Sequence, residues 1–207
     1  MNSKESSEVD RIESVVHELS GSLVAAWTYL NLLRGLHEGA RANPLAANRF
    51  GLLFDQLWRA IFDALFAKIG TLIDRKRNMH SLPNLVTLIR RLGDPGQKAR
   101  LVQVESYLSY KEGAIPKIEK WRNNAVAHRP QNLSKDTFSI ENKLDLDDLG
   151  VTLKKLEDAL NNLSENVLAL RVDTFSGPET LIEDGRAMFE MLSKGIDAGR
   201  QENKGST

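Results

Sequence analysis

Apolar residues recur every three or four positions along most of the chain, and this period constrains the fold more than any other feature of the sequence. From Val9 to Leu33 the repeat is unbroken, which predicts an amphipathic helix over about 9–38. We expect Gly35, Gly39 and Asn43–Pro44 to end this helix and start the next, because glycine is unfavourable inside helices and proline suits a first turn.

The same repeat predicts further helices downstream. They cover about 44–74, 83–92, 97–111, 145–172 and 178–197, and a short helix restarts after Gly113 through Ile115, Ile118 and Trp121. The sequence contains no internal repeat and no strand-period pattern of useful length. It therefore predicts an all-α fold, a compact up-and-down bundle of five to seven helices in one domain over 9–197, with disordered tails at 1–8 and 198–207.

Two apolar stretches and one cap refine this prediction. An aromatic ring at every fourth residue makes a stripe that favours the core over a cofactor site: Phe50, Phe54, Trp58, Phe62 and Phe66. Near-heptad leucines between Leu149 and Leu170 suit either a bundle core or the seam of a dimer. Asp145 precedes these leucines and is expected to cap their helix.

The composition excludes several classes of protein and site. The chain has no cysteine, so disulfides and thiolate zinc sites are excluded, which fits a reducing cytoplasm. No window approaches the roughly 18 apolar residues of a membrane span. The polar N-terminus is not a signal peptide. His17, His37 and His80 form no ligand pattern, so we expect no metal, no cofactor and a cytoplasmic protein without a membrane partner.

The net charge is zero, but the charge is unevenly distributed. Residues 75–129 carry twelve Lys and Arg against four Asp and Glu, a net charge of +8. Residues 1–74 and 130–207 have net charges of −2 and −6. A basic region of this kind attracts polyanions. Alternatively, helices of opposite charge simply pair with each other inside the bundle.

The segment 120–130 lies in this basic third and concentrates side chains that handle phosphate and protons. It reads Lys-Trp-Arg-Asn-Asn-Ala-Val-Ala-His-Arg-Pro. An arginine followed shortly by a histidine also occurs at Arg11–His17 and Arg75–His80, so spacing alone carries little information. We expect the first pair to lie on a regular helix surface and the second in a solvated or phosphate-contacting connector.

Context separates the Arg122–His128 pair from the other two. Pro130 disfavours helical geometry at Arg129, so the helix is expected to end near His128, where a loosened turn can bring the imidazole towards Arg122. Asn123 adds a polar group, and the small Ala125 and Ala127 leave room for a ligand or a second helix.

The segment resembles the signature of the HEPN superfamily, in which an arginine, a polar residue and then a histidine occur late in a helical bundle. Arg122, Asn123 and His128 match this pattern. The residues of the segment, together with the loop and the leucine helix that follow it, resemble the AbiU-type, abortive-infection branch over about 9–172. The resemblance implies a homodimeric, metal-independent endoribonuclease that acts in phage defence or as the toxin of a toxin–antitoxin pair.

This resemblance agrees with the chemistry of RNA cleavage. Attack by the 2′-hydroxyl needs a base, an acid and positive charge on the phosphate. Two copies of the motif would provide two histidines and two arginines. We therefore expect His128 and Arg122 to be catalytic and Asn123 and Arg129 to support them. The basic residues nearby are expected to bind RNA: Arg75, Lys76, Arg77 and Lys120.

Other interpretations stay open at this stage. Arg122 could pair with Glu119 one turn earlier, and His128 could cap a helix. The protein would then be a non-catalytic helical module that binds RNA, nucleotide or a protein partner such as an antitoxin or another defence protein. A third possibility is a structural bundle whose leucine helix assembles with a partner.

Overall fold

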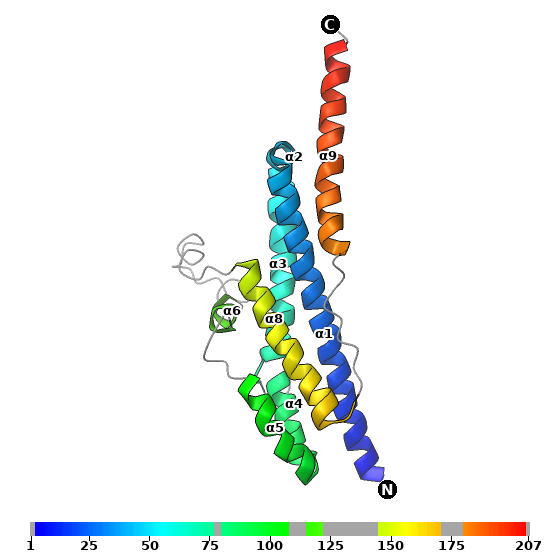
Figure 1. The fold of residues 1–207 in the computed structure, drawn as a ribbon, viewed down its shortest axis with the longest axis vertical. Coiled ribbons are helices and arrows are strands. Elements are labelled where there is room, and N and C mark those ends of the chain that lie inside the picture. Colours follow the sequence, from blue (N-terminus) through cyan, green and yellow to red (C-terminus); the bar gives the residue numbers. More distant parts are fainter. Residues whose placement is uncertain (1–2, 77–79, 108–114, 122–144, 171–179, 206–207) are drawn as a thin grey trace.

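The computed structural model describes residues 3–76, 80–107, 115–121, 145–170 and 180–205. These residues form eight α-helices and one π-helical turn, with no strand among them (Figure 1): α1 Ser3–Ala42, α2 Pro44–Arg49, α3 Gly51–Ile73, α4 Leu82–Leu92, α5 Pro95–Tyr107, α6 Ile115–Trp121, α8 Leu146–Asn161, η2 Asn162–Val167 and α9 Thr180–Gly205. The predicted all-α bundle is confirmed. Seven of the described helices have at least seven residues, as in the predicted range of five to seven helices. The eighth, α2, has six residues.

Helix α1 runs along most of the molecule and contacts almost every other part of it. Its 40 residues span about 60 Å. Helix α3 runs along it, α4 lies beside its N-terminal part and α9 beside its C-terminal part, and α8 begins near Arg34 and descends along it (Figure 1). Its apolar face is buried from Ile12 to Leu36, as the period of the sequence predicted.

The predicted boundary at Asn43–Pro44 is confirmed, because α1 ends at Ala42 and Pro44 opens α2, but the predicted end at Gly35 and Gly39 is wrong. Helix α1 continues through both glycines because α9 crosses it there. A Cβ added at Gly35 would lie 2.7 Å from the carbonyl oxygen of Ile182, and one at Gly185 would lie 2.6 Å from the carbonyl carbon of Gly35. A Cβ at Gly39 would lie 2.6 Å from the Phe189 ring. These glycines let two helix backbones approach closely instead of terminating one.

The second predicted helix is divided in two. The backbone leaves helical geometry at Phe50, with φ −108° and ψ 21°, and this residue separates α2 from α3. The aromatic stripe on α3 is only partly core. Phe66 is fully buried, whereas Phe54, Trp58 and Phe62 are half-buried.

The leucine helix packs inside its own chain, which decides between the two predicted roles. The side chains of Leu149, Leu153, Leu160 and Leu163 are completely buried against the rest of the bundle. They therefore form core within this chain, the first of the two predicted roles. The helix also ends earlier than predicted, because α8 changes into the π-helical η2.

Two features terminate η2. Ala169 has a positive φ of 55°, a conformation that ends a helix, and the Leu170 N–H donates back to the Ser164 carbonyl at 2.8 Å. The Arg100 guanidinium on α5 donates to the carbonyl of Asn166 at 2.7 Å. A basic side chain on a neighbouring helix therefore caps this end.

The last helix is longer and differently buried than predicted. Helix α9 extends to Gly205 instead of ending near residue 197, and it rises past α2 at the top of the molecule (Figure 1). Among its described side chains, Phe189 and Ile196 are buried, whereas Leu181, Met188 and Leu192 are half-buried.

Candidate functional site

The residues expected to carry catalysis lie outside the described residues. Arg122, Asn123, His128 and Arg129 belong to the stretch 122–144, and Arg77 belongs to 77–79. The structure does describe the residues on both sides of 122–144. The site is therefore built here from its two anchors, α6 on one side and the start of α8 on the other.

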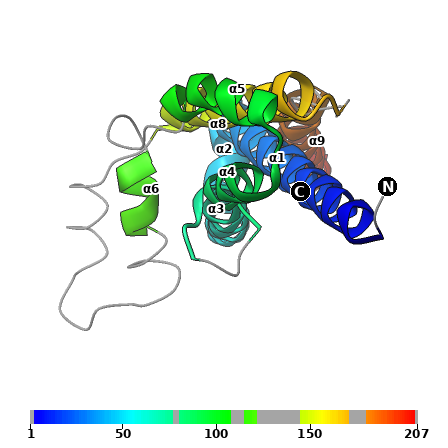
Figure 2. The ribbon, with the colours of Figure 1, turned by 90° about the horizontal axis from the view of Figure 1, so that it is seen from below.

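Helix α6 holds the residue that directly precedes Arg122. Its apolar side chains Ile115 and Ile118 are buried, and the Trp121 ring lies 5.7 Å from the ring of Phe62 and 6.0 Å from that of Phe66, centre to centre. The helix stands to one side of the others, next to α3 (Figure 2). Trp121, the last described residue before Arg122, is therefore held against α3.

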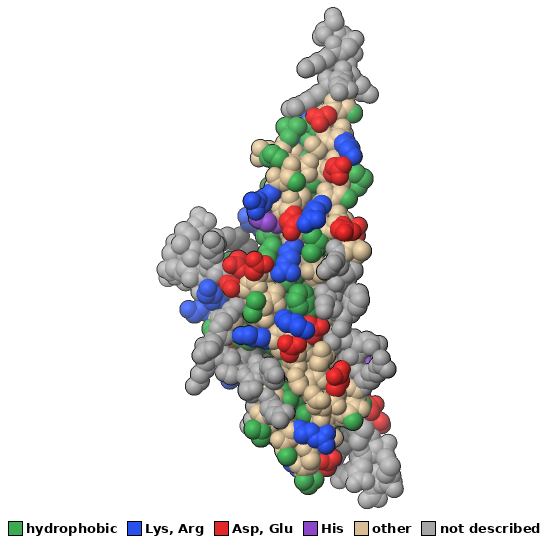
Figure 3. Space-filling model, in the orientation of Figure 1, with side chains coloured by type: hydrophobic (Ala, Val, Ile, Leu, Met, Phe, Trp, Pro, Cys, Tyr) green, Lys and Arg blue, Asp and Glu red, His purple; other side chains and the backbone are tan. Residues whose placement is uncertain are grey.

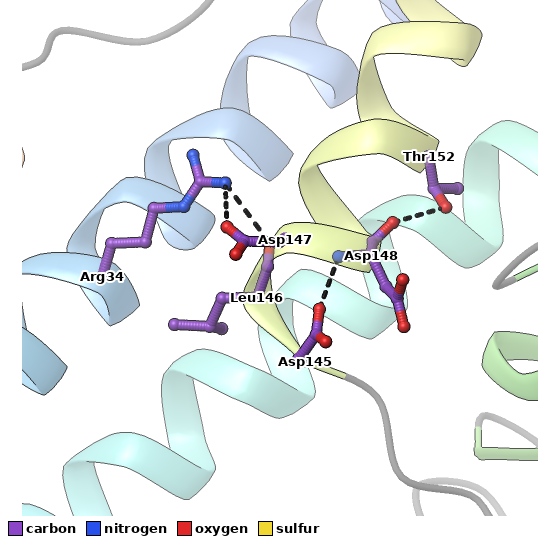
Figure 4. Close-up of polar contacts among 6 residues, drawn as sticks. All are labelled: Arg34, Asp145, Leu146, Asp147, Asp148 and Thr152. Atoms are coloured by element: carbon purple, nitrogen blue, oxygen red, sulfur yellow. Dashed lines mark hydrogen bonds and ion pairs between the residues drawn. The ribbon is translucent and has the colours of Figure 1, made fainter.

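The start of α8 is held by a cap and by a guanidinium from α1 (Figure 4). The Asp145 carboxylate accepts from the Asp148 N–H at 2.6 Å, so the predicted N-cap is confirmed. The Arg34 guanidinium donates to the Leu146 carbonyl and to the Asp147 carboxylate, both at 3.4 Å. These bonds tie the first turn of the leucine helix to α1.

Gly150 makes room for this guanidinium. A Cβ added at Gly150 would lie 2.6 Å from Nη2 of Arg34. Any larger residue would push the arginine off the first turn of α8. The sequence did not reveal the role of Arg34, because the pairing of α1 with the start of α8 joins residues more than a hundred positions apart.

The predicted RNA-binding residues are spread over two places. Lys120 is exposed beside Trp121 at the end of α6. Arg75 and Lys76 are exposed in the connector after α3, which begins about 10 Å along the helix axis from Phe66. Asn84 fixes this connector by donating to the Lys76 carbonyl at 2.6 Å.

The other two Arg–His pairs have ordinary structural environments. Arg11 and His17 are exposed on the regular surface of α1, as expected. His80 forms an ion pair with Glu18 of α1, and this contact holds the connector against the bundle. The positions of His17 and His80 therefore need no catalytic role to explain them.

A small aromatic pocket lies between α1, α3 and α9. It has a volume of about 180 Å³ and is lined by Leu36, His37, Ala40, Phe54, Trp58 and Phe189. The His37 and Trp58 ring centres are 6.1 Å apart, and Phe54 stacks on Phe189 with centres 4.1 Å apart. The sequence predicted that the aromatic residues form core and that His37 belongs to no ligand pattern. It therefore did not predict this pocket.

Comparison with models of known protein families shows to which family the chain belongs. A model of the AbiU2 family of HEPN domains matches residues 10–185. The chain belongs to this family. No curated protein and no solved structure matches it.

The family match confirms the predicted membership of the HEPN superfamily and its abortive-infection branch. The matched residues of this AbiU2-family chain include α6, the whole segment from Arg122 to His128 and the capped start of α8. They also reach Gly185, where α9 crosses α1, but leave out Phe189 and Ile196.

Two further observations concern the described residues of this AbiU2-family protein. They contain no group of three or more His, Cys, Asp or Glu side chains that could hold a metal ion. Over the same ranges, every helix is too short or too polar to cross a membrane.

Proposed function

We propose that this protein is a metal-independent endoribonuclease of the HEPN type, acting in phage defence or as a toxin. In this proposal, Arg122 and His128 from both protomers of a homodimer cleave RNA. Asn123 and Arg129 support them, and Lys120, Arg75, Lys76 and Arg77 bind the RNA backbone.

One observation carries the proposal. The AbiU2 family match contains Arg122 and His128, at the spacing of the superfamily's motif, directly after Trp121. The Trp121 ring packs on α3, so the chain enters the motif from a residue that is anchored on the bundle. A nuclease motif needs such an anchor, because catalytic groups act only when the scaffold holds them close to their productive geometry.

The chemistry follows from the residue types. One His128 takes the proton of the RNA 2′-hydroxyl. The 2′-oxygen then attacks the adjacent phosphorus. The bond from phosphorus to the 5′-oxygen breaks, and the second His128 donates a proton to that oxygen. Both Arg122 guanidinium groups neutralise the phosphorane through paired N–H donors. The products are a 2′,3′-cyclic phosphate and a 5′-hydroxyl.

Cleavage of single-stranded RNA by the purified protein in EDTA tests this proposal. We expect cutting in the presence of the chelator and the two end groups named above. His128→Ala should reduce the rate by at least about a hundredfold, the usual contribution of a general acid or base. His17→Ala is the matched control, because His17 is exposed on α1 and should leave the rate unchanged.

The predicted dimer is tested by exchanging subunits between the parent protein and an excess of His128→Ala. The parent activity should fall, because a heterodimer keeps only one of the two histidines that the mechanism needs; an unchanged activity would contradict a site shared by two chains. Activity that survives in His128→Ala alone, with its helical circular dichroism intact, would exclude His128 from the mechanism.

A second candidate is a non-catalytic AbiU2-family module that binds RNA, nucleotide or a protein partner. The acidic start of α8 favours it, because Asp145, Asp147 and Asp148 lie at one end of the motif segment and repel phosphate (Figure 4). Acidic and basic side chains are interspersed over the face of the molecule in Figure 3, which shows no uniformly basic surface among the described residues. Exposed Leu52 and Leu53 on α3 also suit a protein partner. This candidate predicts binding without any cleavage.

A further inference from the structure

Exposed leucines gather where α2 meets α3. Four of them lie between residues 45 and 57: Leu45 on α2, and Leu52, Leu53 and Leu57 on α3. The other large apolar side chains that the described residues expose lie singly on α5, α8 and α9. A single exposed apolar side chain is ordinary on a protein surface, whereas a group of them marks a surface that another molecule covers.

A regular stripe runs along α3 through two of these leucines. We call it the α3 stripe and define it by six residues spaced alternately by three and four: Phe50, Leu53, Leu57, Ala60, Ala64 and Ala67. Four of them are exposed, and Phe50 and Ala64 are half-buried. Alternating steps of three and four are the a and d spacing with which one helix packs along another.

The α3 stripe lies away from the contacts that α3 makes within its own chain. Successive residues of a helix turn by about 100°, so Ala60 and Ala64 point about 120° and 160° away from Phe66. Phe66 is buried, and its ring lies beside that of Trp121 on α6. Figure 2 shows α3 at the edge of the bundle, with α1 on its inner side. A second helix can therefore pack along the stripe without displacing α1 or α6.

The α3 stripe is complementary in shape to a second copy of itself. Its first three side chains are large and its last three are alanines. When two α3 helices pack antiparallel about a two-fold axis between residues 58 and 59, Leu57 faces the partner's Ala60 and Leu53 faces the partner's Ala64. The same axis brings the first member of the stripe opposite the partner's last. Each large side chain thus meets a small one, which is the self-complementarity that a two-fold interface needs.

The charges beside the stripe do not oppose this pairing. The stripe itself contains no charged residue. Asp55 and Arg59 form an ion pair within α3 at 2.9 Å, so their charges offset each other. The exposed Gln56 and Asp63 flank the stripe, and the same axis brings Gln56 close to the partner's Asp63. An amide that can donate a hydrogen bond therefore faces that carboxylate.

We propose that two copies of this chain associate through the α3 stripe, with their α3 helices antiparallel about a two-fold axis. The inference rests on the proposed nuclease in one respect, because a site shared by two chains requires a second copy of the chain. The position of the interface follows from the described residues alone.

The size of the stripe determines how firmly the two copies associate. Helix α3 has 23 residues and is therefore about 35 Å long, and a helix is about 10 Å wide. Pairing along one helix covers roughly 350 Å² on each copy, less than the roughly 800 Å² of a stable interface. The dimer therefore dissociates on dilution, and the chain in dilute solution keeps Leu53 exposed.

Sedimentation of the full chain over about a hundredfold range of concentration measures this association. The parent should pass from monomer to dimer as the concentration rises. Leu53→Asp places a charge in the stripe and should weaken the dimer at least about tenfold. Leu52→Asp is the matched control, because Leu52 is the more exposed neighbour and points about 100° away from Leu53. It should leave the dimer unchanged.

An exchange of side-chain size tests which residues face each other. Ala60→Leu places a leucine against the partner's Leu57 and should weaken the dimer at least about tenfold through overpacking. Adding Leu57→Ala to Ala60→Leu puts a small residue opposite each new leucine, so the double variant should recover most of the lost affinity. Circular dichroism confirms that each variant is folded.

Introduced cysteines report the orientation, because the chain has no cysteine of its own. An equal mixture of Leu53→Cys and Ala64→Cys should form a disulfide between the two different chains. In the antiparallel pair, the two copies of residue 53 are about 16 Å apart along the axis, beyond the roughly 7 Å between Cα atoms that a disulfide spans. Leu53→Cys alone should therefore not cross-link, and a disulfide in that variant alone overturns the antiparallel arrangement.

The outcomes separate this inference from the proposed function. A chain that stays monomeric at every concentration, or a dimer that Leu53→Asp does not weaken, overturns the assignment of the stripe, and cutting of RNA by that protein leaves the nuclease standing. If Leu53→Asp abolishes the dimer and RNA is still cut at the parent rate, the interface stands and the shared catalytic site fails. If the parent dimerises through the stripe and cuts no RNA, the interface stands and the nuclease fails.

Discussion

The two ends of the bundle share the helices α1 and α3 and differ in what surrounds them. In the lower bundle, defined as residues 12–33 of α1 and 61–73 of α3 with α4, α5, α8 and η2, leucines and isoleucines fill a closed core. In the upper bundle, residues 35–42 of α1 and 51–60 of α3 with α2 and α9, glycines bring helices together and leucines remain exposed. Apolar residues make up more than half of α3 in both regions, and whether one of them forms core or an accessible surface depends on which helices cover it.

The contrast within α3 gives the largest expected effect. Leu65→Ala removes a fully buried side chain of the lower bundle and should reduce the free energy of unfolding by about 2–5 kcal/mol. Leu53→Ala, in the upper bundle, removes a side chain that is 62% exposed and should change it by less than about 0.5 kcal/mol. Urea unfolding followed by circular dichroism measures both. Equal losses would show that Leu53 is covered in solution, for instance by a second copy.

The second test concerns the glycines where α9 crosses α1. It distinguishes a glycine that allows close contact of two helix backbones from one that ends a helix. Gly185→Ala places a methyl group against the backbone of Gly35 and should destabilise the protein by about 1–3 kcal/mol. Gly21→Ala has nothing within 4 Å and should stabilise it by about 0.5–1 kcal/mol. Thermal unfolding of the two variants gives opposite shifts if α9 crosses α1 as described. A stabilised Gly185→Ala variant would contradict that crossing.

The capped start of α8 lies between the two regions and should give an intermediate effect. Asp145→Ala leaves the Asp148 N–H without its acceptor and should cost about 0.5–2 kcal/mol of stability. Asp147→Ala removes an exposed partner of Arg34 and should cost less than about 1 kcal/mol. Chemical denaturation compares the two. If Asp147→Ala reduced the stability more than Asp145→Ala, the contact with Arg34 would contribute more to stability than the N-cap.

The smallest effect concerns an ion pair on the exposed part of α9. The hydrogen bond and charge of Lys194 lower the pKa of the Glu190 carboxyl. A lowered carboxyl pKa stabilises the folded state above the ordinary carboxyl range, and this stabilisation is lost as the pH falls through the folded-state pKa. Glu190→Gln should therefore lower the melting temperature slightly at neutral pH and not in acid. Added salt should reduce even the neutral difference.

The sequence predicted most of the fold because its information is local. The helical period located α4 within one residue, and the chemistry of Asp145 predicted a cap that the structure contains. Gly35 and Gly39 misled the prediction, because glycine both ends helices and allows helices to cross closely. Only the position of α9 distinguishes these uses, and that contact joins residues about 150 positions apart.

The candidate site could be predicted only in part for the same reason. Arg122 and His128 were found as a motif within a few residues, and their roles stay predictions. The pocket between His37 and Trp58 was missed, because nothing in either helix indicates which residue faces the other. A half-buried aromatic residue and a core aromatic residue have the same spacing along α3.

The positions of the tryptophans give the protein an optical property that can be used. The chain has three tryptophans. Trp27 is buried in the lower bundle, whereas Trp58 lines the pocket and Trp121 ends α6. The two half-buried indoles therefore lie close to each other along α3, since the Trp121 ring packs on Phe62, one turn after Trp58. Their emission will respond to binding at either place in the unlabelled protein, and a Trp58→Phe variant separates the two signals.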